Sequence, residues 1–102
     1  MIKITKENLT IVIVTLKSEE VIHQCLQSIP SDIKKIIIEN SANQNFTNEL
    51  EKKYKNIETH LTNENLGMGK ANNIGIGKSK TNYVMILNPD TVLRKDTLDT
   101  IF

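Results

Sequence analysis

The residues with the clearest chemical potential are a carboxylate and a glycine turn, and both suit a phosphorylated ligand. Asp90 follows an apolar run and Pro89, where one carboxylate oxygen could hold a hard divalent cation that bridges two phosphates. The turn Gly67-Met68-Gly69 leads into a predicted helix, whose N-terminal N–H groups can approach phosphate closely. Each signal is weak alone. Asp90 suits a turn or cap equally well, and Asn72 stands where a dinucleotide fingerprint needs its third glycine.

Other phosphate- and metal-binding patterns are incomplete. The exit of the first apolar run, Thr15-Leu16-Lys17, lacks both the glycines of a dinucleotide fold and the acidic cluster of a phosphoacceptor domain. Gly77-Lys78-Ser79 ends a predicted helix, so it does not form a phosphate-binding loop. His23 and His60 have no ligand-like spacing to Cys25, which argues against zinc. Cys25 occupies an apolar helical position, and we expect it to pack in the core.

Composition is typical of one small globular domain over residues 1–102. Thirteen Lys+Arg against twelve Asp+Glu leave a formal net charge of +1, which provides no electrostatic footprint for nucleic acid. We therefore expect no nucleic-acid partner. The apolar runs are far shorter than the roughly 20 residues of a membrane-spanning helix, and the N-terminus lacks the pattern of a secretory signal. These features predict a cytoplasmic protein.

Predicted strands and helices alternate along the chain. Strands are expected over residues 9–15, 34–39, 57–61 and 82–88, the third at an edge of the sheet and the others buried. The first helix is expected from the N-cap Ser18 to Pro30, with Glu19 and Glu20 in its first turn. Three more helices are expected, one from Thr47, one from about Lys70 to Ser79 and one from Asp96. Gly75 and Gly77 predict close packing of the third helix. This order predicts an α/β fold with a parallel sheet, helices on both faces and a binding cleft at the carboxyl ends of the strands.

Four segments of the chain together form a pattern that is far more specific than any one of them. They are, in order, Ile11–Glu20, Ile36–Ser41, Asn65–Gly75 and Val84–Asp90. In this order they resemble the N-terminal, nucleotide-sugar-binding half of a family 2 glycosyltransferase domain. The resemblance covers nearly the whole chain, from Leu9 to Phe102. It implies the GT-A fold, a three-layer Rossmann-like sheet of about four parallel strands, truncated before the acceptor half.

The individual matches differ in specificity. Asn65–Gly75 is the most specific, since it resembles the family's Asn-x-Gly…Ala-x-Asn-x-Gly loop and helix beside the nucleotide. Val84–Asp90 resembles the strand that ends in the family's Asp-x-Asp motif, in the Asn-Pro-Asp form of rhamnosyltransferase-like members, and only the last aspartate survives. Glu39 stands where the family has an aspartate that contacts the nucleotide base. Leu16 and Lys17 depart from the family's Tyr-Asn.

The resemblance implies a donor site for a UDP- or dTDP-linked sugar. Glu39 would accept a hydrogen bond from the base, while the residues after the first strand would line the base and ribose. Asp90 would hold Mg²⁺ or Mn²⁺ on the diphosphate. The complete set of implied donor-binding residues is Thr15, Leu16, Lys17, Glu19, Glu39, Asn40, Gly67, Lys70 and Asn88.

The resemblance places the general base and the acceptor site beyond Phe102, so the catalytic residues are unknown and the chain is expected to be inactive alone. The implied reaction transfers a sugar to a hydroxyl of a glycan or a lipid-linked acceptor in cell-surface polysaccharide synthesis, in the cytoplasm or at the inner face of the membrane. An uncovered apolar edge would favour a homodimer or modest stability. The alternative is a non-catalytic nucleotide-binding or interaction module derived from a glycosyltransferase.

Overall fold

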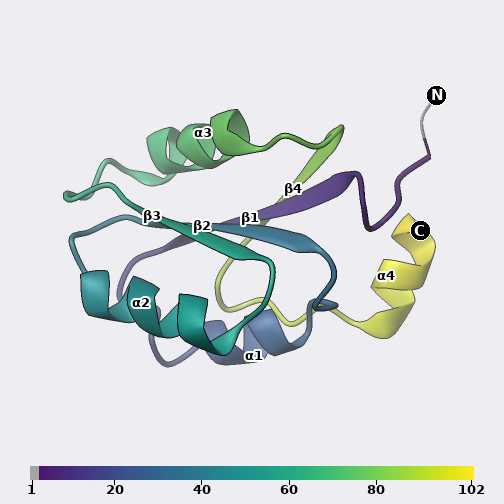
Figure 1. Cartoon of the computed structure of the whole chain (residues 1–102), viewed down its shortest axis with the longest axis horizontal. Coiled ribbons are helices and arrows are strands. Elements are labelled where there is room, and N and C mark those ends of the chain that lie inside the picture. Colours follow the sequence, from purple (N-terminus) through teal and green to yellow (C-terminus); the bar gives the residue numbers. More distant parts are fainter. Residues whose placement is uncertain (1–2) are drawn as a thin grey trace.

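Four parallel strands lie between two layers of helices in the computed structural model, which describes residues 3–102 (Figure 1). The strand order is β3-β2-β1-β4, so the first two strands of the chain are central. This arrangement confirms the predicted α/β fold. The strands are β1 (Leu9–Thr15), β2 (Lys34–Glu39), β3 (Ile57–Leu61) and β4 (Tyr83–Leu87), and the helices are α1 (Ile22–Gln27), α2 (Gln44–Lys53), α3 (Met68–Lys78) and α4 (Lys95–Ile101).

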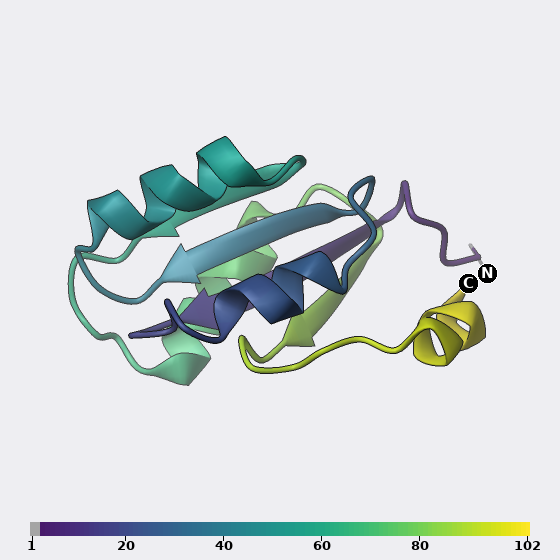
Figure 2. The same cartoon turned by 90° about the horizontal axis from the view of Figure 1, so that it is seen from below.

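The central strands β1 and β2 divide their side chains between two apolar cores. Every residue of β1 is buried, as its unbroken β-branched run predicts for a strand covered on both faces. Ile11 and Ile37 belong to the larger core, on the side of α1 and α2. Val12 and Ile36 belong to the smaller core, which includes Ala71 of α3. Figures 1 and 2 show α3 on one face of the sheet and α1 and α2 on the opposite face.

Helix α3 approaches β1 closely at one glycine. A Cβ atom at Gly75 would overlap with Cγ1 of Val12, so only glycine permits this distance between helix and strand. Ala71, one turn earlier, is also fully buried. The expectation of close packing at Gly77 is wrong, because a Cβ there would meet no atom within 4 Å. Two residues along a helix correspond to a rotation of about 200°, which turns Gly77 away from the sheet.

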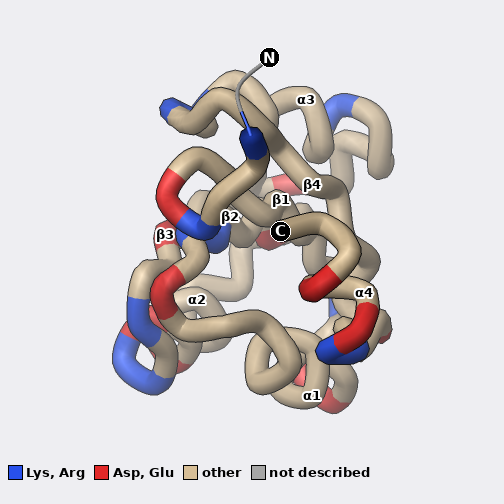
Figure 3. The backbone as a smooth tube through the Cα atoms, turned by 90° about the vertical axis from the view of Figure 1, so that its right-hand side faces the viewer, with Lys and Arg blue, Asp and Glu red and all other residues tan. Residues whose placement is uncertain are grey.

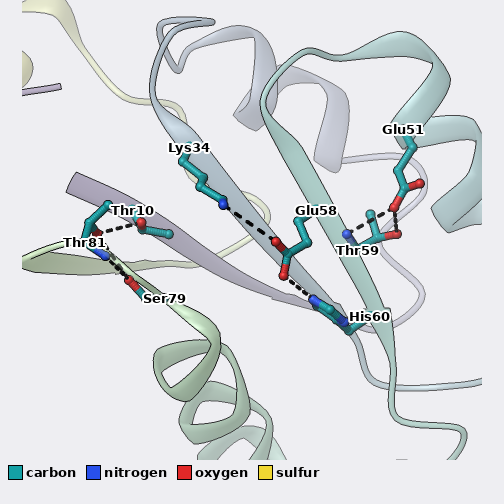
Figure 4. A network of polar contacts seen from close by, with 8 residues as sticks. All are labelled: Thr10, Lys34, Glu51, Glu58, Thr59, His60, Ser79 and Thr81. Carbon is teal, nitrogen blue, oxygen red and sulfur yellow. Dashed lines mark hydrogen bonds and ion pairs between the residues drawn. The ribbon is translucent and has the colours of Figure 1, made fainter. Parts of the chain in front are cut away.

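The edge strand β3 carries the polar side chains of Glu58 and His60 on the face of the sheet that also carries α3, because their register partners Ile36 and Ile38 belong to the smaller core. His60 Nε2 lies 2.5 Å from Glu58 Oε2, and Lys34 of the adjacent strand lies 3.7 Å from the other oxygen of Glu58 (Figure 4). The hydrogen bond from His60 and the nearby positive charges lower the pKa of Glu58. On the opposite face, Thr59 donates a 2.5 Å hydrogen bond to Glu51 of α2. The predicted alternation and edge position of β3 are confirmed.

The prediction that β4 is a buried strand is wrong. It forms the second edge of the sheet, since it pairs only with β1 among the described strands. Tyr83, Val84 and Met85 are half-buried, and Ile86 is 42% exposed. Leu87 is buried in the larger core, Tyr83 and Met85 pack against that core, and Val84 packs against the smaller one. The residues of β4 are apolar because they pack beside β1 and against the two cores. The outer side of β4 has no neighbouring strand, because β4 is last in the strand order.

Helix α1 begins later than predicted. Its N-cap position is Val21, and the Ser18 hydroxyl hydrogen-bonds the backbone N–H and C=O of Leu16 instead of capping the helix. Glu19 and Glu20 therefore lie in the turn before α1 and not in its first turn.

Helix α2 begins earlier than predicted. Asn43 is its N-cap, and the Asn43 side chain accepts a 3.2 Å hydrogen bond from the N–H of Phe46. The helix therefore starts at Gln44 and not at Thr47.

The surface mixes charges of both signs. On the side that Figure 3 shows, acidic and basic positions are interspersed along the backbone. Within residues 3–102, no helix combines the length and apolar character that crossing a bilayer requires.

Candidate functional site

The ends of β1 and β2 bring two predicted site residues together at the carboxyl edge of the sheet. Thr15 and Glu39 are direct neighbours in the parallel register. The carboxyl ends of both strands lie at the left of Figure 2, where the loops that follow them begin. In open parallel sheets this edge is the usual location of a ligand site. We call the residues that leave β1, β2 and β4 at this edge the rim: residues 15–19, 39–41 and 88–90.

Glu39 is a buried carboxylate held by two hydroxyl groups. It is 1% exposed, and Thr15 Oγ1 donates a 2.6 Å hydrogen bond to its Oε1. The Ser41 hydroxyl donates to Oε2. Burying a carboxylate is costly unless it is hydrogen-bonded, and these two donors meet that need without a cation. An ionised carboxylate offers about four acceptor sites. Glu39 therefore retains acceptor capacity for a ligand N–H group.

Asn40 connects the rim to the loop that precedes α3. Its N–H donates a 2.8 Å hydrogen bond to the carbonyl of Thr15. Its Oδ1 accepts 3.0 Å hydrogen bonds from the N–H of Leu66 and the hydroxyl of Thr62, and its Nδ2 donates to Asn65 Oδ1 at 3.1 Å. The side chain is thus fully engaged with the protein. The structure gives Asn40 the role of positioning the loop.

The loop enters α3 through a glycine that the turn requires. Gly67 has φ +85°, a conformation that L side chains rarely adopt. Its N–H donates a 2.9 Å hydrogen bond to the side chain of Asn65. As the N-cap position, Gly67 provides no side-chain acceptor, so the first N–H groups of α3 have no side-chain cap. Lys70 is exposed in this first turn. The start of α3 therefore combines N–H donors with a cation.

The segment after β1 is exposed and includes a strained backbone. Leu16 is 40% exposed, and Lys17 and Glu19 are also exposed. Lys17 has φ +53°, in the left-handed region that costs a residue with a Cβ about 1–2 kcal/mol. The hydrogen bonds of Ser18 to the Leu16 backbone stabilise this turn. The exposed backbone after Thr15 is consequently held in one conformation.

The segment after β4 is attached to α1. The carbonyl of Asn88 accepts a hydrogen bond from Cys25 Sγ at 3.8 Å, and the N–H of Leu93 donates to Ser28 Oγ at 2.9 Å. Burial and the negative charge of Asp90 raise the pKa of the Cys25 thiol to about 11. Cys25 is fully buried, which confirms its predicted packing role. Asn88 and Asp90 are exposed on the outer side of this segment.

Asp90 has the donor chemistry of a Mg²⁺ or Mn²⁺ ligand. Its carboxylate forms no ion pair with any described residue. Among residues 3–102 no group of three or more His, Cys, Asp and Glu residues could hold a metal ion by itself. Mg²⁺ usually binds proteins through one or two carboxylates together with water and substrate phosphates. Asp90 therefore fits a cation that arrives with a phosphorylated ligand.

Several polar residues of this region were not among the predicted site residues. Ser41, Thr62 and Asn65 orient Glu39 and Asn40. Sequence signals for two of them exist, because Ser41 and Asn65 belong to the segments that resemble the family's motifs. Thr62 has a weaker signal, since it directly follows the third predicted strand, at the edge where the binding cleft is expected.

Comparisons with known proteins identify the family and the fold. The model of the family described as Glycosyl transferase family 2 matches residues 10–102. Glycosyltransferase GlyA of Streptococcus pneumoniae is 22% identical over 102 aligned positions, which cover 94% of this chain and 15% of that protein.

Solved structures of S. aureus TarS share the fold. The crystal structure of TarS 1-349 superposes with a TM-score of 0.78 at 20% identity, covering 91% of this chain and 30% of that chain. TarS 1-349 in complex with UDP gives 0.74 at 18% identity, and the complex with UDP-GlcNAc gives 0.75 at 19%. Both superpositions cover 91% of this chain, and respectively 30% and 29% of the TarS chain. The chain thus spans less than a third of the length of these relatives.

Proposed function

Because the chain belongs to glycosyl transferase family 2, we propose that its rim binds the nucleotide diphosphate of an activated sugar for transfer to an acceptor hydroxyl. The observation that carries the proposal is the buried Glu39, whose two oxygens are oriented by Thr15 and Ser41 at the carboxyl edge of the sheet. Such a carboxylate is preorganised to accept a hydrogen bond. A fully solvated surface glutamate would lack this fixed orientation.

Glu39 reads the nucleotide base in this proposal. Uracil and thymine each present one ring N–H, which suits a carboxylate that has acceptor capacity left. A base that presents only an acceptor at the corresponding position, such as adenine N1, would leave the buried Glu39 carboxylate without a ligand donor, and this favours uracil or thymine over adenine. The ordered turn at Leu16 and Lys17, with Glu19 and the neighbouring Asn40, borders the base and ribose.

The diphosphate is held from two sides. The first N–H groups of α3, with Gly67 and Lys70, provide hydrogen-bond donors and positive charge. On the side of β4, Asp90 provides one ligand to Mg²⁺ or Mn²⁺, with Asn88 beside it. When bound, this cation would neutralise charge on the departing nucleoside diphosphate. The carboxylate of Asp90 keeps the cation at the rim, while Lys70 balances the phosphate charge that remains.

Two observations bear on the donor class, and they favour different donors. TarS crystallised with UDP and with UDP-GlcNAc, which supports a UDP-linked donor. The Asn88-Pro89-Asp90 sequence has the form of rhamnosyltransferase-like members, which supports a dTDP-linked donor. The acceptor in either case is a hydroxyl of a glycan or lipid-linked intermediate of cell-surface polysaccharide. Residues 1–102 provide the donor-binding half of this reaction, with the general base supplied from outside these residues.

Nucleotide titration of the 102-residue chain tests the proposal. Amide spectra are recorded with UDP, dTDP, UDP-GlcNAc and ADP, each with and without Mg²⁺. We expect saturable shifts at residues 15–19, 39–41, 67–70 and 88–90 with the pyrimidine nucleotides, strengthened by Mg²⁺. Glu39→Gln should reduce the preference for UDP over ADP, and the control Glu58→Gln on β3 should leave it unchanged. Absence of shifts at the rim of the folded chain would overturn the proposal and favour the non-catalytic module.

A further inference from the structure

A cavity lies at the opposite end of the sheet from the rim. Its volume is about 490 Å³, within the range of about 300–1,000 Å³ that small-molecule sites occupy. It is open to solvent and is lined by the end of α1, the loop that follows it, the start of β2 and the end of α2. The lining residues are Leu26, Gln27, Ser28, Ile29, Pro30, Ser31, Lys35, Tyr54 and Lys55.

Lys35 is an unpaired cation at the wall of this cavity. It is 2% exposed, and no described residue forms a hydrogen bond or ion pair with its ammonium group. It lies on the same face of β2 as Ile37, under α1 and α2, because side chains alternate along a strand. Lysine is almost never this buried unless it is paired. The Nζ atom of Lys35 is not among the buried polar atoms that lack a partner, so it keeps some access to solvent at the cavity that Lys35 lines, where an anion could reach it.

The other lining residues define what kind of anion fits. Lys55 adds a second positive charge, and the last turn of α2 carries two more lysines, Lys52 and Lys53. No Asp or Glu lines the cavity. The nearby Asp32 is paired with Lys6 at 3.7 Å. Leu26, Ile29 and Pro30 provide apolar walls.

Two of the polar groups in the wall are already engaged by the protein. The Tyr54 hydroxyl lies 2.6 Å from His23 Nδ1. Ser28 Oγ donates to the carbonyl of Cys25 and accepts from the N–H of Leu93. The side-chain donors left are the ammonium groups of Lys35 and Lys55, the hydroxyl of Ser31 and the amide of Gln27.

We propose that this cavity binds a small organic anion, whose carboxylate or phosphate group is held by Lys35 and Lys55 and whose apolar part lies against Leu26, Ile29 and Pro30. The site is separate from the rim. Lys35 and Glu39 are four residues apart on β2, or about 13 Å along the strand, and Lys35 is at its amino end. Burial lowers the pKa of Lys35, an effect that the charge of Asp32 opposes, and a bound anion would oppose it further.

Titration with small aromatic probes tests this site. Amide spectra of the 102-residue chain are recorded with phenyl phosphate, benzoate and the neutral benzyl alcohol. We expect saturable shifts at residues 26–31, 35, 54 and 55 with at least one of the anions, and weaker binding of benzyl alcohol. Phenyl phosphate and benzoate distinguish a phosphate ligand from a carboxylate ligand.

Two matched variants separate this site from non-specific binding. Lys35→Met keeps an unbranched buried side chain and removes the charge, and it should weaken anion binding about tenfold or more, the loss expected for a charge-assisted hydrogen bond. Lys34→Met removes a charge from the opposite face of the same strand and should not change binding. Absence of saturable shifts at the cavity with both anions would overturn the proposal, as would equal affinity of Lys35→Met or equal affinity for benzyl alcohol.

Discussion

Thr15 Oγ1 lies 2.6 Å from Glu39 Oε1, and this hydrogen bond joins the carboxyl ends of the two central strands. Both residues are buried, so neither group can exchange its partner for bulk water without local opening. The bond therefore contributes to stability and also orients the carboxylate that the proposed donor site uses. Its two roles can be measured separately.

Thr15→Val tests the contribution of this bond to folding. Valine has nearly the shape of threonine, so packing is kept while Glu39 loses one of its two hydroxyl donors. We expect the free energy of unfolding to fall by about 1–3 kcal/mol, measured by urea denaturation. Thr15→Ser restores the hydroxyl and should recover most of the loss. Equal stability of Thr15→Val and the unmodified chain would show that Glu39 is satisfied without Thr15.

Asn40→Ala tests the attachment of the 65–67 loop to the rim. The substitution removes the acceptor of the Leu66 N–H and the donor to Asn65. We expect a stability loss of about 1–3 kcal/mol and faster hydrogen exchange at the Leu66 and Gly67 amides. Asn45→Ala on the exposed side of α2 is the control and should change neither quantity. Unchanged exchange in Asn40→Ala would mean that the loop is held by other contacts.

Gly75→Ala and Gly77→Ala form a matched pair in one helix. A methyl group at Gly75 overlaps with Val12, so overpacking should destabilise the chain by about 1–3 kcal/mol. A methyl group at Gly77 meets nothing, so higher helix propensity should stabilise it by roughly 0.5–1 kcal/mol. Thermal unfolding of both variants measures the difference. The same sign of effect at both positions would contradict the observed packing of α3.

Asp90→Asn tests the cation ligand without changing the size of the side chain. Asp90 is exposed, so we expect the melting temperature to stay nearly unchanged. The gain in UDP affinity on adding Mg²⁺ should fall at least several-fold, measured by calorimetry. Asp96→Asn on α4 is the control for general charge effects. A full Mg²⁺ effect in Asp90→Asn would exclude Asp90 from the cation site.

Cys25 makes stability depend on pH in the alkaline range. Burial and Asp90 raise the pKa of its thiol from 9.0 to about 11 in the folded chain. Below pH 9 the thiol is neutral in both states and stability is unaffected. As the pH rises from 9 to 11 only the unfolded chain loses the proton, so the free energy of unfolding falls, by at most about 1.4 kcal/mol per pH unit. Urea denaturation of Cys25→Ser should show a smaller fall, and identical pH profiles would contradict this.

The strand bounds were largely predictable because long β-branched runs have no competing local structure. β1, β2 and β3 begin and end where the sequence predicts. The start of α1 was missed because the Ser18 hydroxyl bonds the Leu16 backbone, an alternative to capping that local sequence cannot exclude. The start of α2 had a usable signal in Asn43, an N-cap type three residues before Phe46.

The candidate site was predictable at the level of the rim and not at the level of single contacts. Glu39 and Thr15 meet because parallel strands align their carboxyl ends. Whether the Asn40 amide faces a ligand or the protein depends on the path of residues 65–67, which are distant in sequence. The burial of β4 was overestimated for a related reason, since strand order is a property of the whole sheet.

The two edges of the sheet differ in how they meet another molecule. β3 presents Glu58 and His60, and charged groups on an edge discourage strand addition. β4 presents the apolar run Tyr83–Leu87 with Ile86 exposed, and it lacks that protection. A molecule with one unprotected edge strand can pair with one other copy through that strand, and it then has no second unprotected strand for a further copy. Pairing of two copies through β4 would therefore use the unprotected edge of both, whereas two unprotected edges per copy would permit open-ended fibres.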